Sequence, residues 1–522
     1  MAARWLAVEP DADICDELQL LIDGDPAVLA ERFAGNLTFG TAGLRAAVGA
    51  GPLRMNRLVI RQAAAGLADY LKASDPRAAE RGVVIGYDVR RKSDVFAKDT
   101  ARVIAAAGVK AMVLPDPLPT PVLAWSITEL DATAGVMVTA SHNPPADNGY
   151  KVYLGDGAQI VPPHDAAIAD RIALVDPTAV ALAETDDPLI TTLDDGVTAA
   201  YLASIAEVRL RPDVPGIRVA YTPLHGVGGE TACTAFELAG FDRPVVVAEQ
   251  FEPDGSFPTV SFPNPEEPGA LDLLLALADE SGADLAIAND PDADRLGAAI
   301  PQPDGSWRRL GGDEIGWLLA DHILGNTTGD DRLVITTLVS SSLLGDLAKS
   351  YGVHAEETYT GFKWIARTIL DNPGLRFVLG YEQALGYLVA PRPLDKDGIS
   401  AALMLTEVAS VAAAEGTTMQ QRLDEIAARF GSHVTIDKAV RMDPAAAAKA
   451  VERLQAQPPN ELGGAAVVDV VAFPEADLLR FELAGGVRVQ VRPSGTEPKV
   501  KIYGEAVDAD PTPYVDALIS LI

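Results

Sequence analysis

Short apolar runs rich in β-branched residues alternate with amphipathic helical patterns along most of this chain. The run GVVIGYDV (82–89) is typical of a buried strand, and DVFAKDTARVIAAAG (94–108) behind it is typical of a helix. Two more buried strands are predicted at KAMVLP (110–115) and GVMVTA (135–140). Strands that alternate with helices form parallel or mixed sheets with helices on both faces, so the pattern predicts an α/β fold.

The same pattern restarts after about residue 206 and again near residue 311, but the last hundred residues depart from it. There a single helix is followed by closely spaced alternating strands, which is typical of an antiparallel sheet. A chain of 522 residues is also too long for one hydrophobic core. We therefore predict three α/β mixed-sheet domains and a smaller C-terminal α+β domain around a central cleft, covering residues 1–205, 206–310, 311–430 and 431–522.

The balance of charge limits the partners of the chain. Lys and Arg number 42 against 74 Asp and Glu, which gives a net charge of −32. Nucleic acids and anionic membranes need a basic footprint, so neither is expected, and an anionic ligand needs a locally basic pocket. Cys15 and Cys233 are too few for a disulfide framework. Charges interrupt the apolar runs and the first residues lack a signal-peptide pattern, so we expect a cytoplasmic protein.

The loop TASHNPPADNGYKVY (139–153) places Ser141 directly after a predicted buried strand. Ligands gather at the carboxyl ends of parallel strands, and the two prolines that follow stiffen the loop. A hydroxyl held in this way is a nucleophile if a neighbour takes its proton or stabilises its charge, and His142 and Lys151 are nearby candidates. The alternative is an ordinary turn with a capping serine.

The loop NDPDADRLG carries three alternating carboxylates, Asp290, Asp292 and Asp294, after another predicted strand. If this segment is extended, the three side chains lie on one side of it. Clustered carboxylates repel one another unless a cation holds them, and Mg²⁺ prefers such oxygen ligands. A calcium-binding EF-hand is excluded, because its sixth and twelfth positions are here Arg295 and Pro301. The alternative is a solvated acidic turn.

The loop VRPSGTEPKVKIY (491–503) has the composition of a phosphate cradle. It groups Arg492, Ser494, Gly495 and Thr496, which together offer a guanidinium fork, hydroxyls and accessible backbone N–H groups. A Walker A motif does not occur anywhere in the sequence. The alternative is a polar hairpin turn between two strands.

Weaker signals come from single residues at strand ends and in turns. Glu382 ends an apolar strand, where a carboxylate can accept hydrogen bonds from sugar hydroxyls, although a surface glutamate is the simpler interpretation. Arg45 follows the glycine-rich turn FGTAGLR, and Lys396 lies in the turn DKDGIS. The segment GYDVRRKSD (86–94) also places an aspartate and arginines at a strand end. Each of these is compatible with an ordinary surface loop.

Taken together, the loops resemble those of the α-D-phosphohexomutase superfamily, in the same order and over nearly the whole chain. The segments FGTAGLR, TPLHGVG and TYTGFKW are most similar to its phosphoglucomutase-2 branch. The resemblance implies that Ser141 carries a phosphoryl group and joins Asp290, Asp292 and Asp294 around Mg²⁺. It also implies catalytic roles for His142, Lys151 and Arg45, and substrate binding by Arg295, Thr360, Gly361, Glu382, Lys396, Arg492, Ser494, Gly495 and Thr496.

The activity implied by the resemblance is a phosphosugar mutase that interconverts hexose 1-phosphate and hexose 6-phosphate through a phosphoserine. A sugar 1,6-bisphosphate would be its intermediate and activator, and the protein would be a monomer or homodimer. Glucose is the expected sugar of this mutase. The alternative activities are those of a phosphomannomutase, a phosphopentomutase and, less favoured, a metal-dependent sugar phosphatase. One position departs from the dual glucose/mannose enzymes, because Ala384 stands where they have a serine that helps to bind the sugar.

Overall fold

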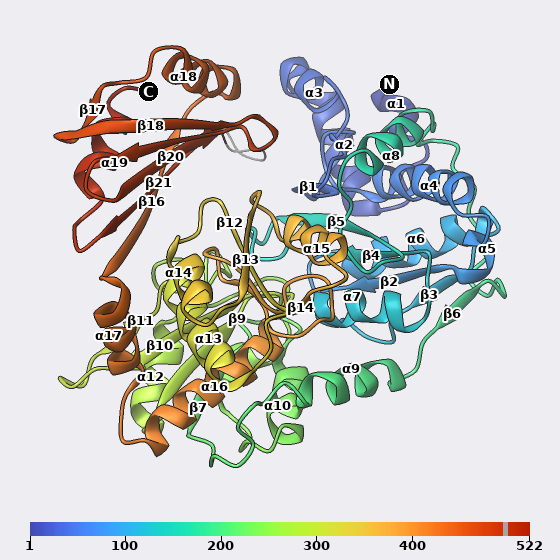
Figure 1. Cartoon of the computed structure of the whole chain (residues 1–522). Helices are drawn as coiled ribbons and strands as arrows, with labels where there is room; N and C mark the ends of the chain where they lie inside the picture. The colour runs from blue at the N-terminus through green and yellow to red at the C-terminus, as the bar shows by residue number, and fades with distance from the viewer. Residues whose placement is uncertain (494–498) are drawn as a thin grey trace. The chain divides into compact units, whose positions relative to one another are not determined.

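The computed structural model describes residues 1–493 and 499–522 (Figure 1). The chain divides into two compact units. Unit 1 contains Met1–Leu310 and Leu385–Val411, and unit 2 contains Gly311–Ala384 and Ala412–Ile522. Three mixed helix and sheet layers and a separate C-terminal antiparallel sheet confirm the predicted fold class. The expected central cleft and the four domain boundaries stay predictions.

Unit 1 begins with three short helices and a six-stranded sheet in which β5 is antiparallel to both of its neighbours, β1 and β4, while the pairs β4–β2, β2–β3 and β3–β6 are parallel. The strand order is β1 (Leu44–Ala47), β5 (Asp147–Leu154), β4 (Ala134–Val138), β2 (Val83–Tyr87), β3 (Ala111–Val113) and β6 (Ile190–Thr192). The three N-terminal helices are α1 (Ala2–Leu6), α2 (Ala12–Asp23) and α3 (Pro26–Arg32).

Helices cover both faces of this sheet. Alternate strand residues point to opposite faces, so Val83 and Ile85 pack with α4 (Arg57–Ser74) and α6 (Ser93–Ala106) in one core. A Cβ added at Gly86 would instead meet Leu123 of α7 (Thr120–Glu129) on the other face. The prediction of buried strands between helices is therefore confirmed here.

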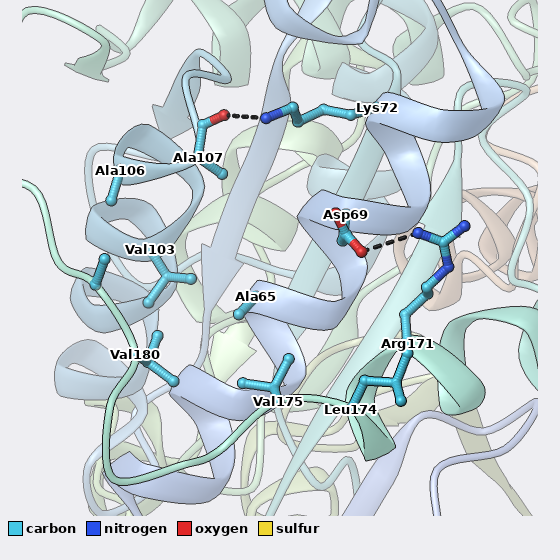
Figure 2. A pocket seen from close by; sticks show the side chains of 11 residues that line it. Ala65, Asp69, Lys72, Val103, Ala106, Ala107, Arg171, Leu174, Val175 and Val180 are labelled. Carbon is cyan, nitrogen blue, oxygen red and sulfur yellow. Dashed lines mark hydrogen bonds and ion pairs between the residues drawn. The ribbon is translucent and has the colours of Figure 1, made fainter.

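A shallow hollow lies over the helices of this layer, beside α4, α6 and α8 (His164–Ala173) (Figure 2). Its volume is about 310 Å³, and its floor is formed by small apolar side chains such as Ala65 and Val103. The polar side chains at its rim already have partners: Arg171 Nη1 donates to Asp69 Oδ2 at 2.9 Å, and Lys72 Nζ donates to Ala107 O at 2.8 Å. None of the predicted site residues lines this hollow.

The second sheet of unit 1 has β9 at its centre, parallel to β7 and antiparallel to β10. Its edge strand β8 is only two residues long, because a helical turn begins at Ala248. The elements are β11 (Trp307–Arg309), β10 (Leu296–Pro301), β9 (Leu285–Asn289), β7 (Val219–Thr222), β8 (Val245–Val246), α9 (Gly196–Ala206), α10 (Gly229–Leu238), α11 (Ala248–Phe251) and α12 (Asp272–Ser281).

A later segment of the chain returns to unit 1 and lies against the end of β9. The backbone N–H of Leu296 donates to Leu385 O at 3.0 Å, and that of Gly398 donates to Ala293 O at 3.1 Å. This segment contains β15 (Gly386–Leu388) and the start of α16 (Gly398–Ala414), whose residues are buried up to position 412. It brings the predicted turn with Lys396 to the aspartate loop.

Unit 2 contains a parallel layer, in which β12 lies between β13 and β14, and an antiparallel C-terminal sheet. The two pack together through Glu505, which accepts hydrogen bonds from Ser341 Oγ at 2.6 Å and from the Ser342 N–H at 3.0 Å. The first layer comprises α13 (Gly312–Asn326), β12 (Arg332–Thr337), α14 (Leu343–Ser350), β13 (His354–Thr358), α15 (Phe362–Asp371) and β14 (Arg376–Glu382), with α17 (Met419–Phe430) beside α13.

The C-terminal sheet has six strands, and two α-helices accompany it in the same part of the chain, drawn in orange to red in Figure 1. Its first strand, β16, was not predicted, because exposed positions dominate it. The strand order is β16 (His433–Arg441), β21 (Lys499–Val507), β20 (Val487–Pro493), β19 (Leu478–Leu483), β18 (Ala465–Phe473) and β17 (Glu461–Leu462), and the helices are α18 (Pro444–Ala456) and α19 (Thr512–Ile519).

Among residues 1–493 and 499–522, no single helix has both the length and the apolar composition to cross a membrane. The pair α16 and α17 satisfies the same criteria only when both helices are counted together across a bend.

Candidate active site

Ser141 lies in a tight turn directly after β4, and it is 3% exposed. Its backbone is left-handed (φ 50°), a conformation that is uncommon for a residue with a side chain. The Ser141 N–H donates to Thr139 Oγ1 at 2.9 Å, which helps to hold this turn. The hydroxyl is therefore fixed at the carboxyl end of a parallel strand, as the sequence predicts.

The three aspartates follow β9 in a turn rather than in an extended segment, so the predicted mechanism of their clustering is wrong. Ala293 is left-handed (φ 54°), and this reversal folds the loop back on itself. One carboxylate oxygen from each of Asp290, Asp292 and Asp294 lies within 4.8 Å of the others, and all three side chains are buried. Curvature brings the three carboxylates together where alternation was expected to do so.

The serine turn and the aspartate turn meet. Ser141 Oγ donates to Asp290 Oδ2 at 2.7 Å, although 149 residues separate the two in sequence. Thr120, at the start of α7, donates from Oγ1 to Asp292 Oδ2 at 2.5 Å and from its N–H to Asp292 O at 2.9 Å. The first and second sheets of unit 1 thus supply the two halves of one buried polar cluster.

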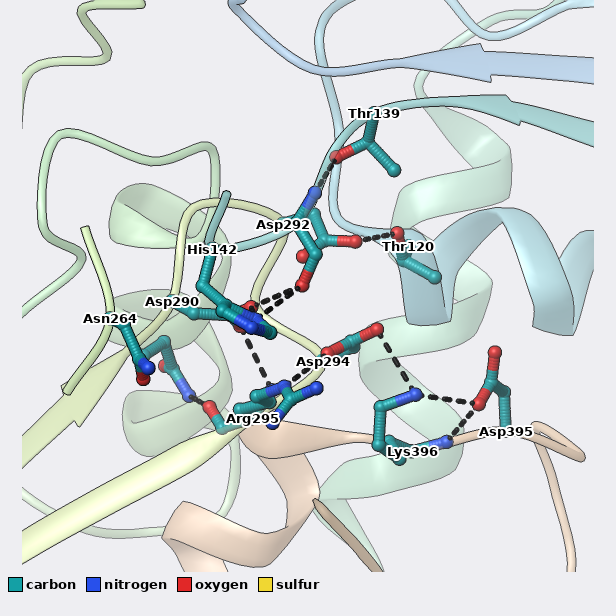
Figure 3. Close-up of polar contacts among 12 residues, drawn as sticks. Thr120, Thr139, His142, Asn264, Asp290, Asp292, Asp294, Arg295, Asp395 and Lys396 are labelled. Atoms are coloured by element: carbon teal, nitrogen blue, oxygen red, sulfur yellow. Dashed lines mark hydrogen bonds and ion pairs between the residues drawn. The ribbon is translucent and has the colours of Figure 1, made fainter. Parts of the chain in front are cut away.

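Two lysines neutralise part of the acidic cluster, and Figure 3 shows one of them, Lys396, between Asp294 and Asp395. Lys151 lies on β5 and not in a loop, and its Nζ donates to Asp292 Oδ2 at 2.7 Å and to Asp294 Oδ2 at 2.8 Å. Lys396 Nζ lies 3.2 Å from Asp294 Oδ2 and 3.1 Å from Asp395 Oδ1. Lys151 was predicted to lie in a loop. Because it lies on a strand of the sheet, it is a buried ion-pair partner of the aspartates.

The protonation of the aspartates differs because their surroundings differ. Burial, and then repulsion from Asp292 and Asp294, raises the pKa of Asp290 well above its ordinary value. Burial also acts to raise the pKa of Asp294, but the adjacent lysines and Arg295 overcome it and hold that pKa low. Asp290, which accepts the hydrogen bond from Ser141, therefore takes up a proton more readily than Asp294 does.

His142 lies beside the Ser141 hydroxyl, and the two predicted arginines contact the serine loop and the aspartate turn. His142 Nδ1 lies 3.2 Å from Ser141 Oγ, and its side chain is 24% exposed. Burial, followed by the charges of Arg295 and Arg45, keeps the pKa of His142 well below its ordinary value. Arg45 Nη1 donates to Asn143 Oδ1 at 3.0 Å. Arg295 donates from its backbone N–H to Asp290 Oδ1 at 3.0 Å, while its side chain lies beside Asp294.

The aspartates retain the oxygen atoms that a metal needs. Among the residues that the structure describes, Asp292 Oδ1 is buried and has no hydrogen-bond partner, and the same holds for Asp294 Oδ1. A buried carboxylate oxygen without a partner is costly unless a cation completes its environment. Three clustered hard oxygen donors suit Mg²⁺, so the residues present fit the predicted ion.

The remaining predicted residues lie in unit 2. Glu382 ends β14, is 9% exposed, and accepts a hydrogen bond at 2.6 Å from the N–H of Gly361. Gly361 has φ 115°, which side chains rarely tolerate, and Thr360 precedes it in the same turn. Arg492 lies near the end of β20. The other members of the predicted phosphate cradle, Ser494, Gly495 and Thr496, lie outside the described residues.

Several polar residues around the cluster were missed or left without a role. Tyr153 Oη and Gln159 Nε2 each donate to Asp395 Oδ2 at 2.7 Å, so Asp395 is held from two sides beside Lys396. Thr120 carries no signal in its own segment, because its partner is 172 residues away. Arg90, which the sequence places at a strand end, has its guanidinium directed at the serine loop.

Four family models match successive parts of this chain. They are described as phosphoglucomutase/phosphomannomutase alpha/beta/alpha domain I (residues 36–178), alpha/beta/alpha domain II (199–305), alpha/beta/alpha domain III (311–430) and C-terminal domain (438–517). The chain belongs to the phosphoglucomutase/phosphomannomutase family. The family resemblance inferred from the loops is thereby confirmed, and the chain is a phosphomutase enzyme of this type.

Individual relatives of this family member carry different names. It is 46% identical to a Haemophilus influenzae protein named "Probable phosphomannomutase", with 88% of this chain and 94% of that protein covered. It is 34% identical to the human phosphopentomutase, with 96% and 90% covered. The fold matches that of a phosphoglucomutase/phosphomannomutase family protein from Burkholderia thailandensis, with a TM-score of 0.73, 21% identity, and 93% and 96% covered.

Proposed function

We propose that this phosphomutase interconverts hexose 1-phosphate and hexose 6-phosphate through a phosphoryl group carried on Ser141. The observation that carries the proposal is the 2.7 Å hydrogen bond from Ser141 Oγ to Asp290 Oδ2 inside a cluster of three buried carboxylates. A phosphoryl group carried on this hydroxyl would lie next to a divalent cation held by the carboxylates. The phosphoserine and the roles of the residues below are parts of the proposal.

In the first half of the reaction, a sugar hydroxyl attacks the phosphorus of phospho-Ser141. The bond from phosphorus to Ser141 Oγ breaks with its electron pair going to Oγ, the bond to the sugar oxygen forms, and the proton of the sugar hydroxyl ends on Ser141 Oγ. His142 is suited to deliver that proton to the departing serine oxygen, because its Nδ1 is 3.2 Å from Ser141 Oγ. Lys151 is already bound to two carboxylates, so its proposed role is to balance charge.

Asp290, Asp292 and Asp294 are the residues that would hold Mg²⁺, and the bound ion would offset negative charge on the transferring phosphoryl group. The bisphosphate formed in the first half must turn and return its other phosphate to Ser141. Arg492 and its neighbouring loop would hold the phosphate that is not reacting. Glu382 would accept hydrogen bonds from the sugar in either orientation.

Glucose 1-phosphate is the expected substrate, with the corresponding 1,6-bisphosphate as activator. A second candidate is mannose 1-phosphate, which the 46% identity to the Haemophilus protein favours. Ala384 lacks the hydroxyl expected in the dual glucose/mannose enzymes, so unequal use of the two sugars is the expected result. A panel of the 1-phosphates of glucose, mannose, ribose and N-acetylglucosamine, with Mg²⁺ and a bisphosphate activator, decides between them.

The proposed carrier is tested by intact-mass spectrometry. The parent protein treated with glucose 1,6-bisphosphate should gain one phosphoryl group at Ser141 and lose it on addition of glucose 1-phosphate. Ser141→Ala should gain none and should lose mutase activity. Full activity in Ser141→Ala would refute the proposal, and release of inorganic phosphate in place of isomerisation would favour a phosphatase.

A further inference from the structure

One buried side chain holds most of the serine loop. Arg90 Nη2 donates to Ser141 O at 2.5 Å and to Asn143 O at 2.6 Å. Its Nη1 donates to Pro144 O at 2.8 Å and to Asp147 O at 3.2 Å. A single guanidinium therefore binds four backbone carbonyls of the loop that bears the proposed phosphoryl carrier.

The guanidinium is itself fixed from behind. Its side chain is fully buried, and Nε lies 3.5 Å from Oδ2 of Asp88, which is also fully buried. Ser93 Oγ donates to the other oxygen of Asp88 at 2.6 Å. The guanidinium carbon of Arg90 lies 4.9 Å from the centre of the Phe257 ring, which belongs to the second sheet's part of unit 1. Arg90 thus has little freedom to follow the loop if the loop moves.

The other hydrogen bonds of the loop reach different groups. The Ser141 N–H donates to Thr139 Oγ1 at 2.9 Å, and Asn143 Nδ2 donates to Asp147 Oδ2 at 2.9 Å. The backbone N–H of Asn143 donates to Ala140 O at 3.0 Å, and that of Asp147 donates to Pro144 O at 3.0 Å. None of these bonds fixes the carbonyl of Ser141, whose left-handed backbone determines the direction of its hydroxyl. Because arginine donates from a rigid planar fork, it can satisfy several carbonyls at once, which a lysine ammonium on a flexible stem does less well.

We infer that Arg90 is a positioning residue, which sets the serine loop so that Ser141 Oγ faces the carboxylate cluster. This inference rests on the proposed function for its catalytic consequence, although the contacts stand without it. Displacement of a reacting atom by about 1 Å can slow a reaction by about 10²-fold. Arg90 makes none of its hydrogen bonds to Asp290, Asp292 or Asp294, so its loss should leave metal binding largely intact.

The test compares Arg90→Lys and Arg90→Met with Arg91→Met in the full chain. Arg91 is the neighbouring arginine; its side chain is 54% exposed and pairs with Asp13 at 2.5 Å. Four quantities are measured: kcat and KM with glucose 1-phosphate, phosphoryl incorporation at Ser141, the Mg²⁺-dependent thermal shift, and hydrogen exchange in residues 141–147.

Both Arg90 variants should lower kcat by about 10²-fold with KM within about twofold of the parent, and should speed exchange in the loop. They should keep the Mg²⁺-dependent shift, and Arg91→Met should match the parent throughout. Parent-like kcat or exchange in the folded Arg90→Lys variant would overturn the inference. An inactive parent would instead refute the proposed function, and the exchange data would still decide whether Arg90 holds the loop.

Discussion

At the scale of single residues, the site concentrates opposite charges on buried side chains. Lys151 is 5% exposed and joins two carboxylates, while Asp395 is 1% exposed and holds Lys396. Removal of one member of such a group leaves its partner charged and unpaired, which costs more than the net contribution of the pair. Side chains in this cluster should therefore be far less tolerant of substitution than the many exposed acidic residues of this chain.

Lys151→Ala should lower kcat by about 10²–10³-fold, because a positioned charge beside the proposed phosphoryl carrier is lost. Lys98→Ala is the matched control: Lys98 is 69% exposed, and its only ion pair is with Asp94 within one helix in the described residues. Steady-state kinetics with glucose 1-phosphate measure both variants. Activity within twofold of the parent in Lys151→Ala would exclude it from the catalytic group.

Chelation should remove activity, and Mg²⁺ should restore it, because the proposed ligands include the oxygens of Asp292 and Asp294 that lack a hydrogen-bond partner among the described residues. Asp292→Asn should abolish the rise in melting temperature that Mg²⁺ causes in the parent. The substitution also weakens the ion pair with Lys151, so melting is compared with and without Mg²⁺ for each protein separately. An unchanged Mg²⁺ response in Asp292→Asn would contradict the assignment.

At the scale of elements, turns with left-handed residues aim the functional groups, and other turns support them. The glycine-rich turn TPLHGVGG lies directly behind the aspartate loop, where the N–H of Val227 donates to Pro291 O at 2.8 Å. A Cβ added at Gly226 would lie 2.4 Å from Pro291 Cα, so only glycine permits this approach. Close backbone packing therefore sets the curvature that clusters the carboxylates.

Gly226→Ala should shift the aspartate loop, lower Mg²⁺ affinity and destabilise the protein by about 1–3 kcal/mol, as overpacking does. Gly345→Ala is the control, because a Cβ added at that exposed helical position meets nothing within 4 Å. It should instead stabilise its helix by about 0.5–1 kcal/mol. Calorimetric Mg²⁺ titration and urea unfolding measure the two effects, and equal behaviour of the variants would be inconsistent with this role of Gly226.

Most of the helices and strands that carry the site can be predicted from the sequence, because each produces a local pattern of buried and exposed residues. The strands before Ser141, Asp290 and Glu382 were all predicted where the structure has them. The exposed strand β16 was not predicted, because a strand with few buried positions lacks the apolar alternation. Thr120 and Arg90 received no role, since their partners come from distant segments. Long-range side-chain contacts leave no local pattern in the sequence.

At the scale of the whole molecule, a buried charge network joins the two layers of unit 2. Burial acts to raise the pKa of Glu505, but hydrogen bonds and charge from His433, Arg488 and Ser341 outweigh it and lower the pKa to about 2. Arg488 Nη2 lies 2.6 Å from Glu505 Oε2. A carboxylate with a depressed pKa stabilises the folded state only while it is ionised.

Glu505→Gln should lower the free energy of unfolding of unit 2 by up to about 3 kcal/mol at pH 7. The ionised group contributes above its unfolded pKa of 4.5, and that contribution is lost as the pH falls towards about 2. The difference between parent and variant should therefore shrink across this range. Hydrogen exchange of β16 and β21 in urea, measured at several pH values, follows unit 2 directly; a pH-independent difference would count against this account.

The path of the chain between the units has a consequence for biosynthesis. The chain leaves unit 1 after Leu310, returns at Leu385 and leaves again after Val411. A nascent polypeptide that has emerged only as far as residue 310 lacks both Lys396 and the carbonyl of Leu385 that pairs with Leu296. The ribosome must therefore deliver a large part of unit 2 before unit 1 can mature. Order of synthesis and order of folding cannot coincide in this enzyme.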